Sequence, residues 1–222
     1  MSAGPGRRGA PVVAVVDYGM GNRRSVEKAL ARAGARAVVT ADHAVLAAAD
    51  GLVVPGVGAF PRAMESLRAR GLDDALRALA ADGTPVLGVC LGMQLLFESS
   101  QEHGGAAGLG LLAGTVTPLQ AGAGRLPHIG WSRVRFTRVS PLLDGLGREA
   151  AFYHVHSYVC RPADASDVVG ESEHGERFAS VVQRGAVAGV QFHPEKSSAA
   201  GLRLLRNFAE ACARPLAAAS AA

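Results

Sequence analysis

Cys90 lies at the junction between two segments with different patterns. Residues 85–89 are an apolar run typical of a buried strand, and residues 93–97 are typical of the start of a helix. Gly88 and Gly92 flank the cysteine two positions away on each side, which is the spacing of a nucleophile elbow, a sharp turn that exposes the reactive atom. A helix N-terminus would also favour the thiolate, because its unpaired amides stabilise negative charge.

A free cysteine is most often a small buried hydrophobe, but a second segment supplies the partners that a nucleophile needs. Residues 187–190 form another apolar run, and His193 and Glu195 follow it. A thiol needs a base to ionise it, and the base needs a third group to fix its tautomer. We therefore predict that Cys90, His193 and Glu195 are the nucleophile, base and orienting acid of an acyl-transfer triad.

The Pro-Gly-Val-Gly turn at residues 55–58 follows a third apolar run. A generic tight turn is the ordinary interpretation, and the turn lacks the spacing and the lysine of a phosphate-binding P-loop. Beside a cysteine elbow, an oxyanion hole is favoured instead: the amide of Leu91 would be one donor and that of Val57 or Gly58 the other. Glycines on both sides of Val57 would let the Gly56–Val57 peptide rotate at low cost, so this peptide is a candidate switch.

Alternating elements must position these loops. In the first half we expect strands at residues 12–16, 35–39, 51–54 and 85–89, and helices at 24–33, 61–70 and 72–82. In the second half we expect strands at 115–119, 131–136, 151–155, 167–171, 180–182 and 187–190, and a helix at 199–213. This order predicts a three-layer α/β fold: a mostly parallel central sheet with helices on both faces and a smaller antiparallel portion in the C-terminal half. The functional loops would meet at the carboxyl ends of its strands.

Composition narrows the class of protein. The 222 residues are 49% hydrophobic and 19% charged, with a net charge of +4, which is typical of a compact α/β protein. No apolar run is long enough to cross a membrane, and arginines alternate with acids, for example over residues 62–77, which argues against a nucleic-acid partner. The cysteines, at positions 90, 160 and 212, have no disulfide or zinc spacing, so a reducing cytoplasm is expected.

One domain is expected over residues 11–214, between a disordered leader at 1–10 and a disordered tail at 215–222. No metal is expected, because the histidines lack metal-ligand spacing. His43, His103 and His174 stand in polar surroundings and are expected to be exposed.

Several segments, taken together and in order, resemble the class I (triad) glutamine amidotransferases. They are residues 17–22, 55–60, 90–97, 108–111, 127–131, 155–158 and 191–198. The resemblance extends from about residue 12 to 208, and its finer match is to the glutaminase subunits of imidazole glycerol phosphate synthase. It implies the fold of that family, with Cys90 attacking the side-chain amide of glutamine, His193 protonating the leaving ammonia and Glu195 holding His193.

The resemblance also implies a substrate site and a partner. Glutamine recognition maps onto Gly58, Gln94, Ser157 and Tyr158, and no cofactor is expected. Ammonia would pass to a cyclase subunit, a (β/α)8 barrel that forms a heterodimer with the glutaminase and makes imidazole glycerol phosphate and AICAR in histidine biosynthesis. The residues expected at this interface are Asn22, Trp131, Tyr153 and Lys196. The isolated chain is expected to be a weak glutaminase that the partner activates.

The sequence departs from the family pattern at Arg23, Ser132 and His154, which stand in segments that the family uses near its partner. Other interpretations stay open. A glutaminase for another synthase, such as that for pyridoxal phosphate, would have a different elbow sequence. A non-catalytic regulatory subunit of the same fold would not need an intact triad. For a cysteine peptidase, the paired His-Pro-Glu is the wrong pattern.

Overall fold

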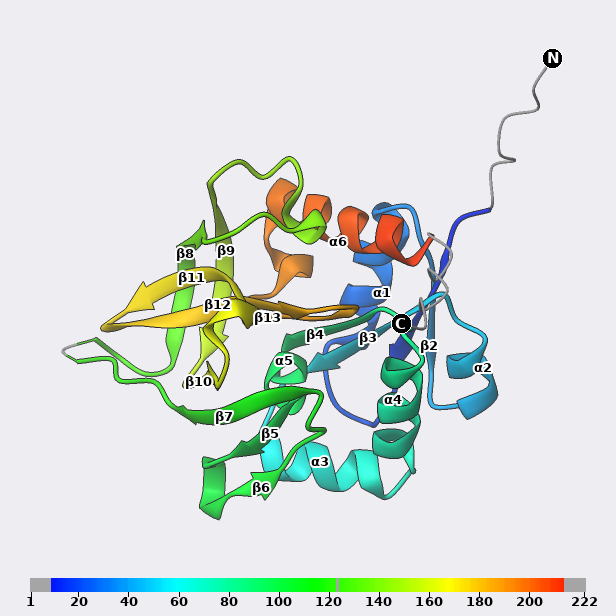
Figure 1. The fold of residues 1–222 in the computed structure, drawn as a ribbon, viewed down its shortest axis with the longest axis horizontal. Helices are drawn as coiled ribbons and strands as arrows, with labels where there is room; N and C mark the ends of the chain where they lie inside the picture. Colours follow the sequence, from blue (N-terminus) through cyan, green and yellow to red (C-terminus); the bar gives the residue numbers. More distant parts are fainter. Residues whose placement is uncertain (1–8, 123, 214–222) are drawn as a thin grey trace, which may run out of the picture.

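The computed structural model describes residues 9–122 and 124–213, and within them nine strands form one mixed sheet in the order β2-β1-β3-β4-β13-β12-β11-β8-β9 (Figure 1). The parallel half consists of β2 (Arg36–Thr40), β1 (Val12–Val16), β3 (Gly51–Gly56), β4 (Val86–Cys90) and β13 (Val187–Val190). The antiparallel half consists of β12 (Glu176–Arg184), β11 (Val168–His174), β8 (His128–Phe136) and β9 (Glu149–His156). Most of the expected leader, and all of the expected tail at 215–222, lie outside the described residues.

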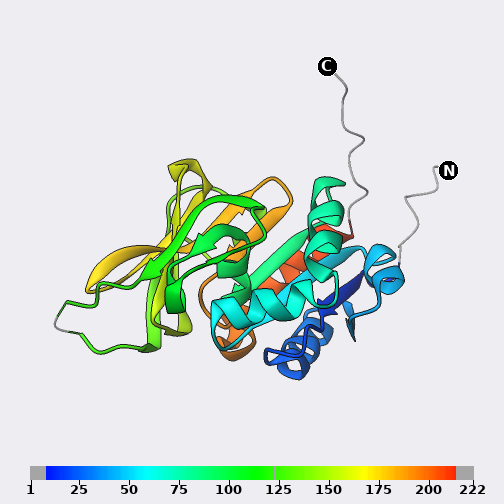
Figure 2. The same cartoon turned by 90° about the horizontal axis from the view of Figure 1, so that it is seen from below.

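Helices cover both faces of the parallel half. On one face lie α1 (Arg23–Arg32) and α6 (Ser198–Cys212), and on the other lie α2 (His43–Ala47), α3 (Phe60–Arg68), α4 (Leu72–Ala81) and α5 (Leu91–Leu95). Figure 2 shows α3 in front of the strands when the molecule is seen from below. Side chains of a strand alternate between the two faces, so Val13 and Val15 pack toward α1 and α6, while Ala14 and Val16 pack toward the other layer. The three-layer α/β prediction is confirmed.

A second, smaller sheet was not predicted. Its order is β10-β7-β5-β6, with β10 (Tyr158–Pro162), β7 (Leu112–Pro118), β5 (Phe97–Ser100) and β6 (Ala106–Ala107). The helix that was predicted to start over residues 93–97 lies two residues earlier. It runs over Leu91–Leu95, and a strand starts at Phe97. The physical reason is that the backbone amides of Leu109 and Leu111 donate to the carbonyls of Leu95 and Leu96 and so end the helix.

The predicted antiparallel strands are correct in position but too short. β8 begins at His128 and β9 ends at His156, and the two residues are paired partners at the end of one ladder. The long ladder brings both histidines into the sheet instead of its loops. No helix in the described part of the chain is long and apolar enough to cross a membrane.

Histidines cluster on the antiparallel half of the sheet. His128, His154 and His156 are buried, and His174, which was expected to be exposed, is half-buried. The ring centroids of His128 and His174 lie 4.2 Å apart in a stacked arrangement, and His128 Nδ1 lies 3.0 Å from His156 Nε2. His154 is fully buried, with Nε2 at 2.9 Å from the hydroxyl of Ser180. The cluster therefore holds several imidazoles away from water.

Burial lowers the pKa of His154 from 6.5 to about 3, and the charges that His156 and His128 would carry lower it further. The unfolded chain binds this proton below about pH 6.5 while the folded chain does not, so stability falls as the pH falls through that range. At pH 5 the loss from one such histidine is about 2 kcal/mol. Between pH 7.5 and pH 5 the free energy of unfolding should fall in both proteins, and we expect the fall to be about 2 kcal/mol smaller in His154→Phe than in the wild type.

Urea unfolding at both pH values measures this difference. His103→Gln, which removes an exposed histidine, is the matched control and should keep the wild-type pH dependence. Equal pH dependence in His154→Phe and the wild type would contradict the burial argument.

Candidate active site

The structure places Cys90 on the turn between β4 and α5. Its backbone has φ 56° and ψ −113°, a region that non-glycine residues rarely adopt and that is retained where neighbours enforce it. The neighbours are tightly packed: a Cβ on Gly92 would lie 1.8 Å from the carbonyl oxygen of Val54, and one on Gly88 would lie 2.6 Å from that of Gly92. Only glycine fits at these positions, which is the physical basis of the elbow pattern.

His193 follows β13 and stands before a 3₁₀ turn over Pro194–Lys196. Its Nδ1 lies 2.9 Å from Oε1 of Glu195, and both side chains are almost completely buried. Burial alone would lower the pKa of His193, but contacts with Cys90 and then with Glu195 outweigh it and raise the pKa to about 9. The imidazole thus has a carboxylate at Nδ1, and the thiol of Cys90 raises its pKa; these are the two partners that the base of a triad requires.

A cavity of about 310 Å³ lies beside the elbow. The predicted residues in its wall are Val57, Gly58, Cys90, Leu91, Gln94, Ser157, Tyr158, His193 and Lys196. Of the predicted catalytic residues only Glu195 is absent from the wall, because it stands behind His193. The loops that follow β3, β4, β9 and β13 thus meet around one small volume.

Gln94, in the cavity wall, forms a buried pair with Gln191. The side-chain amide of Gln94 donates to the carbonyl oxygen of Tyr158 and to Oε1 of Gln191, both at 3.1 Å. The amide of Gln191 in turn points to Sγ of Cys90 at 3.8 Å. Gln191 was not singled out from the sequence, although it opens the segment that contains His193. It donates toward the sulfur, which favours negative charge there.

Glu102 is a further cavity residue that the sequence did not indicate. It is buried, and its Oε2 accepts a hydrogen bond from the backbone amide of Phe60 at 2.8 Å. A buried carboxylate in the wall of a small cavity can bind an ammonium group. In the sequence, Glu102 lies in a polar stretch where nothing distinguishes it from a solvated surface charge.

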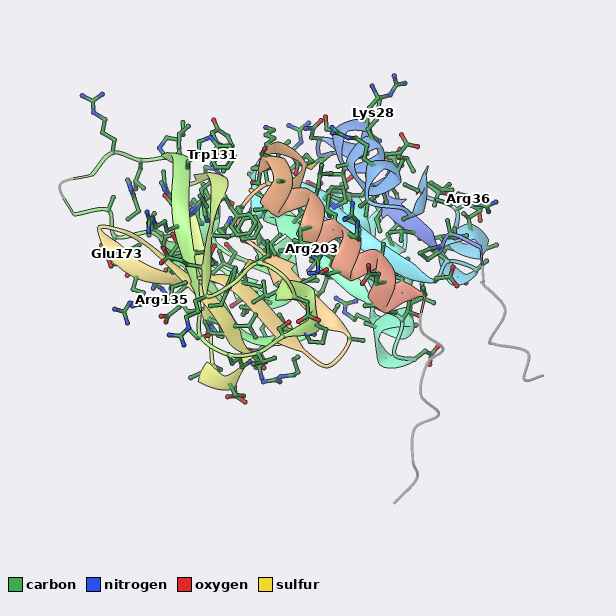
Figure 3. The ribbon with its side chains drawn as sticks, turned by 90° about the horizontal axis from the view of Figure 1, so that it is seen from above. Lys28, Arg36, Trp131, Arg135, Glu173 and Arg203 are labelled. Carbon is green, nitrogen blue, oxygen red and sulfur yellow. The ribbon has the colours of Figure 1, made fainter. Side chains whose placement is uncertain are left out.

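Of the four residues expected at the partner interface, Lys196 alone lines this cavity. Trp131 is 54% exposed on β8, and its ring centroid lies 6.1 Å from that of Tyr153 on β9. In Figure 3, Trp131 and Lys28 of α1 point to the same edge of the molecule. Lys196 is exposed at the cavity wall, and Asn22 is half-buried just before α1. Exposed aromatic side chains near a site are typical of a protein-binding surface.

The departures from the family pattern have separate explanations. Arg23 pairs with Asp17, and the hydroxyl of Ser132 lies 2.8 Å from Nε2 of His128. His154 has no exposed surface and belongs to the histidine cluster. Among the residues that the structure describes, no group of His, Cys, Asp and Glu side chains could hold a metal ion.

Comparison with known proteins agrees with this geometry. A family model described as glutamine amidotransferase class-I matches residues 14–212. The HisH subunit of imidazole glycerol phosphate synthase from Moorella thermoacetica is 50% identical over 198 residues, which are 89% of this chain and 94% of the relative. The HisH subunit from Halobacterium salinarum is 48% identical over 219 residues, which are 96% of this chain and 98% of the relative.

Solved structures share the fold. One described as a crystal structure of a glutamine amidotransferase has a TM-score of 0.70 at 25% identity and covers 90% of this chain and 98% of its own. PurLQS from Thermotoga maritima has a TM-score of 0.73 at 19% identity, over 91% of this chain and 99% of that one, and it supports the fold alone. The chain belongs to the class I glutamine amidotransferase family and, within it, to the HisH subunits of imidazole glycerol phosphate synthase.

Proposed function

We propose that this chain hydrolyses glutamine to glutamate and ammonia with Cys90, His193 and Glu195. The observation that carries the proposal is that the thiol of Cys90, on a strained turn, lies in the wall of a small cavity together with His193. The imidazole of His193 is oriented by the buried carboxylate of Glu195, 2.9 Å from Nδ1. His193 takes the proton of the Cys90 thiol, Sγ attacks the amide carbon of glutamine, and His193 gives the proton to the leaving ammonia. His193 then takes a proton from water, which attacks the thioester, and returns it to Sγ as glutamate leaves.

Two backbone amides are proposed to stabilise the oxyanion. Leu91 is the first residue of α5, so its amide is one of the helix donors without an intrahelical partner. The second donor comes from Val57 or Gly58, in the loop that follows β3. Gly56 pairs with Cys90 in the sheet, which brings this loop alongside the nucleophile.

The start of this loop is held in place, and its next residue is partly exposed. The buried hydroxyl of Tyr18 donates to the carbonyl of Pro55 at 2.5 Å. Val57 is 44% exposed and has glycine on both sides. We therefore place the proposed switch at the Gly56–Val57 peptide, whose rotation would present or remove one oxyanion donor. One such donor is worth roughly 10²–10³ in rate.

The substrate would occupy the same cavity. Gly58, Gln94, Ser157 and Tyr158 are proposed to bind glutamine, since all of them lie in the cavity wall. The carboxylate of Glu102 is proposed to bind its α-ammonium group, which is the one positive group of the substrate. No cofactor takes part in this reaction.

The ammonia is proposed to pass directly to the cyclase subunit, a (β/α)8 barrel that forms a heterodimer with this chain. There it converts phosphoribulosyl-formimino-AICAR nucleotide to imidazole glycerol phosphate and AICAR in histidine biosynthesis. The barrel would dock on the edge that carries Asn22, Trp131, Tyr153 and Lys196. HisH relatives at about half identity over most of the chain support this partner over the pyridoxal phosphate alternative.

Glutamate release with and without the cyclase and its nucleotide ligand tests the proposal, and Lys196→Ala tests the interface. The lone chain is expected to turn over slowly, and the cyclase with its ligand is expected to activate it.

Lys196→Ala removes an exposed charge at the cavity mouth, so we expect roughly tenfold weaker binding of the cyclase or a similar loss of activation.

Arg36→Ala is the matched control for this experiment. It also removes an exposed positive charge, but Figure 3 shows Arg36 well away from Trp131.

Full turnover by the lone chain, without the cyclase or its ligand, would mean that the Gly56–Val57 peptide does not gate the reaction. Unchanged affinity and activation in Lys196→Ala would mean that Lys196 is an ordinary surface charge.

A further inference from the structure

Ser197 joins the proposed general base to β9. It is 1% exposed, and its hydroxyl donates to the carbonyl of His193 at 2.7 Å. The same oxygen accepts from the backbone amide of Tyr153 at 2.9 Å, and the amide of His193 donates to the carbonyl of Tyr153 at 2.9 Å. These hydrogen bonds close a ring, which we call the Ser197 bracket, between β9 and the segment after β13.

We propose that Ser197 is a positioning residue that sets the place of the His193 imidazole opposite Cys90. The proposal rests on the proposed function, because it gives Ser197 a role only if His193 is the base. Ser197 does not line the cavity, so it acts through His193 and not on the substrate.

His193 needs such a support because the sheet ladder does not reach it. The pairing of β13 with β12 and β4 ends at Val190, and His193 stands in an extended conformation before a short 3₁₀ turn. The bracket binds both the backbone amide and the backbone carbonyl of His193, on either side of its Cα. Rotation of the residue would swing the ring away from Cys90, and a displacement of about 1 Å at a catalytic group can cost roughly 10² in rate.

A serine hydroxyl suits this place because it donates and accepts at the same time. Alanine would leave the half-buried amide of Tyr153 without its partner, while the carbonyl of His193 would still accept from the amide of Lys196 at 3.0 Å. The position is also tightly packed, since a Cβ on Gly201 would lie 2.9 Å from Cβ of Ser197. The ring of Tyr153 packs near Trp131, so the bracket also links the base to the strand that carries this aromatic pair.

The test is steady-state glutaminase kinetics of Ser197→Ala in the complex with the cyclase. We expect kcat to fall roughly 10- to 100-fold while KM for glutamine changes little, because the cavity wall is intact. Ser197→Thr keeps the hydroxyl and should recover much of the loss. Ser172→Ala is the matched control: its buried hydroxyl also donates to a backbone carbonyl, that of Arg133 at 2.9 Å, away from the cavity.

A second measurement separates positioning from general loosening. The rate of Cys90 alkylation by iodoacetamide as a function of pH reports how His193 assists the thiol. We expect the profile of Ser197→Ala to shift toward that of His193→Ala, and that of Ser172→Ala to match the wild type. This measurement remains informative even if the extra methyl group of Ser197→Thr does not fit its tightly packed position.

Two results would overturn the proposal. One is a Ser197→Ala variant with wild-type kcat and a wild-type alkylation profile. The other is a loss of kcat that is matched by a loss of folded protein, with the alkylation profile of the folded fraction unchanged. Cys90→Ser measured in parallel keeps the two proposals apart, since a fully active Cys90→Ser enzyme would reject the proposed function itself.

Discussion

Cys90→Ser is expected to reduce glutamine hydrolysis by roughly 10⁴ or more. A hydroxyl is a far weaker nucleophile than a thiolate at neutral pH, and His193 would have to remove a proton from a group that holds it much more tightly. Serine differs from cysteine by one atom, so folding and binding of the cyclase should persist. Glutamate release measures the loss, and ammonia-dependent synthesis by the complex should survive it.

Cys212→Ser is the matched control for this prediction. Cys212 is buried on α6, and burial, followed by the charge of Asp50, raises the pKa of its thiol to about 12. It does not line the cavity, so its replacement should leave glutamine hydrolysis unchanged. If Cys90→Ser still released glutamate at a rate near that of the wild type, Cys90 would not be the nucleophile.

His193→Ala is expected to lose about as much activity as Cys90→Ser, and the double variant should lose little more. Members of a triad act as a unit, so removing either one removes most of what the unit contributes. Glu195→Gln should be milder, because it keeps a side chain of similar shape beside Nδ1 and leaves the base in place. It also removes the negative charge that helps to raise the pKa of His193, so this pKa should fall below about 9.

Rates of glutamate release for the single and double variants measure the coupling, and an NMR titration of the imidazole measures the pKa. Losses that multiply in the double variant would show that Cys90 and His193 act independently. An unchanged pKa of His193 in Glu195→Gln would show that the 2.9 Å contact does not orient a charged imidazole.

The parts of this protein that could be predicted are those whose causes lie close together along the chain. The elbow is one, because the apolar run before Cys90, the helix after it and the glycines on either side are all local features. The parallel strands are another, because burial on both faces makes each one a short apolar run. The meeting of His193 with Cys90 followed from a general rule, that loops at the carboxyl ends of parallel strands share one edge.

The small sheet could not be predicted in the same way. β5 begins where the amides of Leu109 and Leu111 end the elbow helix, and nothing near Phe97 in the sequence signals that event. β8 and β9 were predicted too short because polar residues at their ends, His128 and His156 among them, are buried only through pairing with each other.

The sequence by itself determined the chemistry that we propose for this protein: which side chain attacks, which one moves the proton, and at which edge of the sheet they meet. The tertiary structure alone decided what surrounds them. Glu102 enters the cavity because its carboxylate caps the amide of Phe60, and Ser197 holds His193 through Tyr153. Both are ordinary polar residues along the chain, and they gain their roles from distant backbone groups that only folding brings within hydrogen-bonding distance.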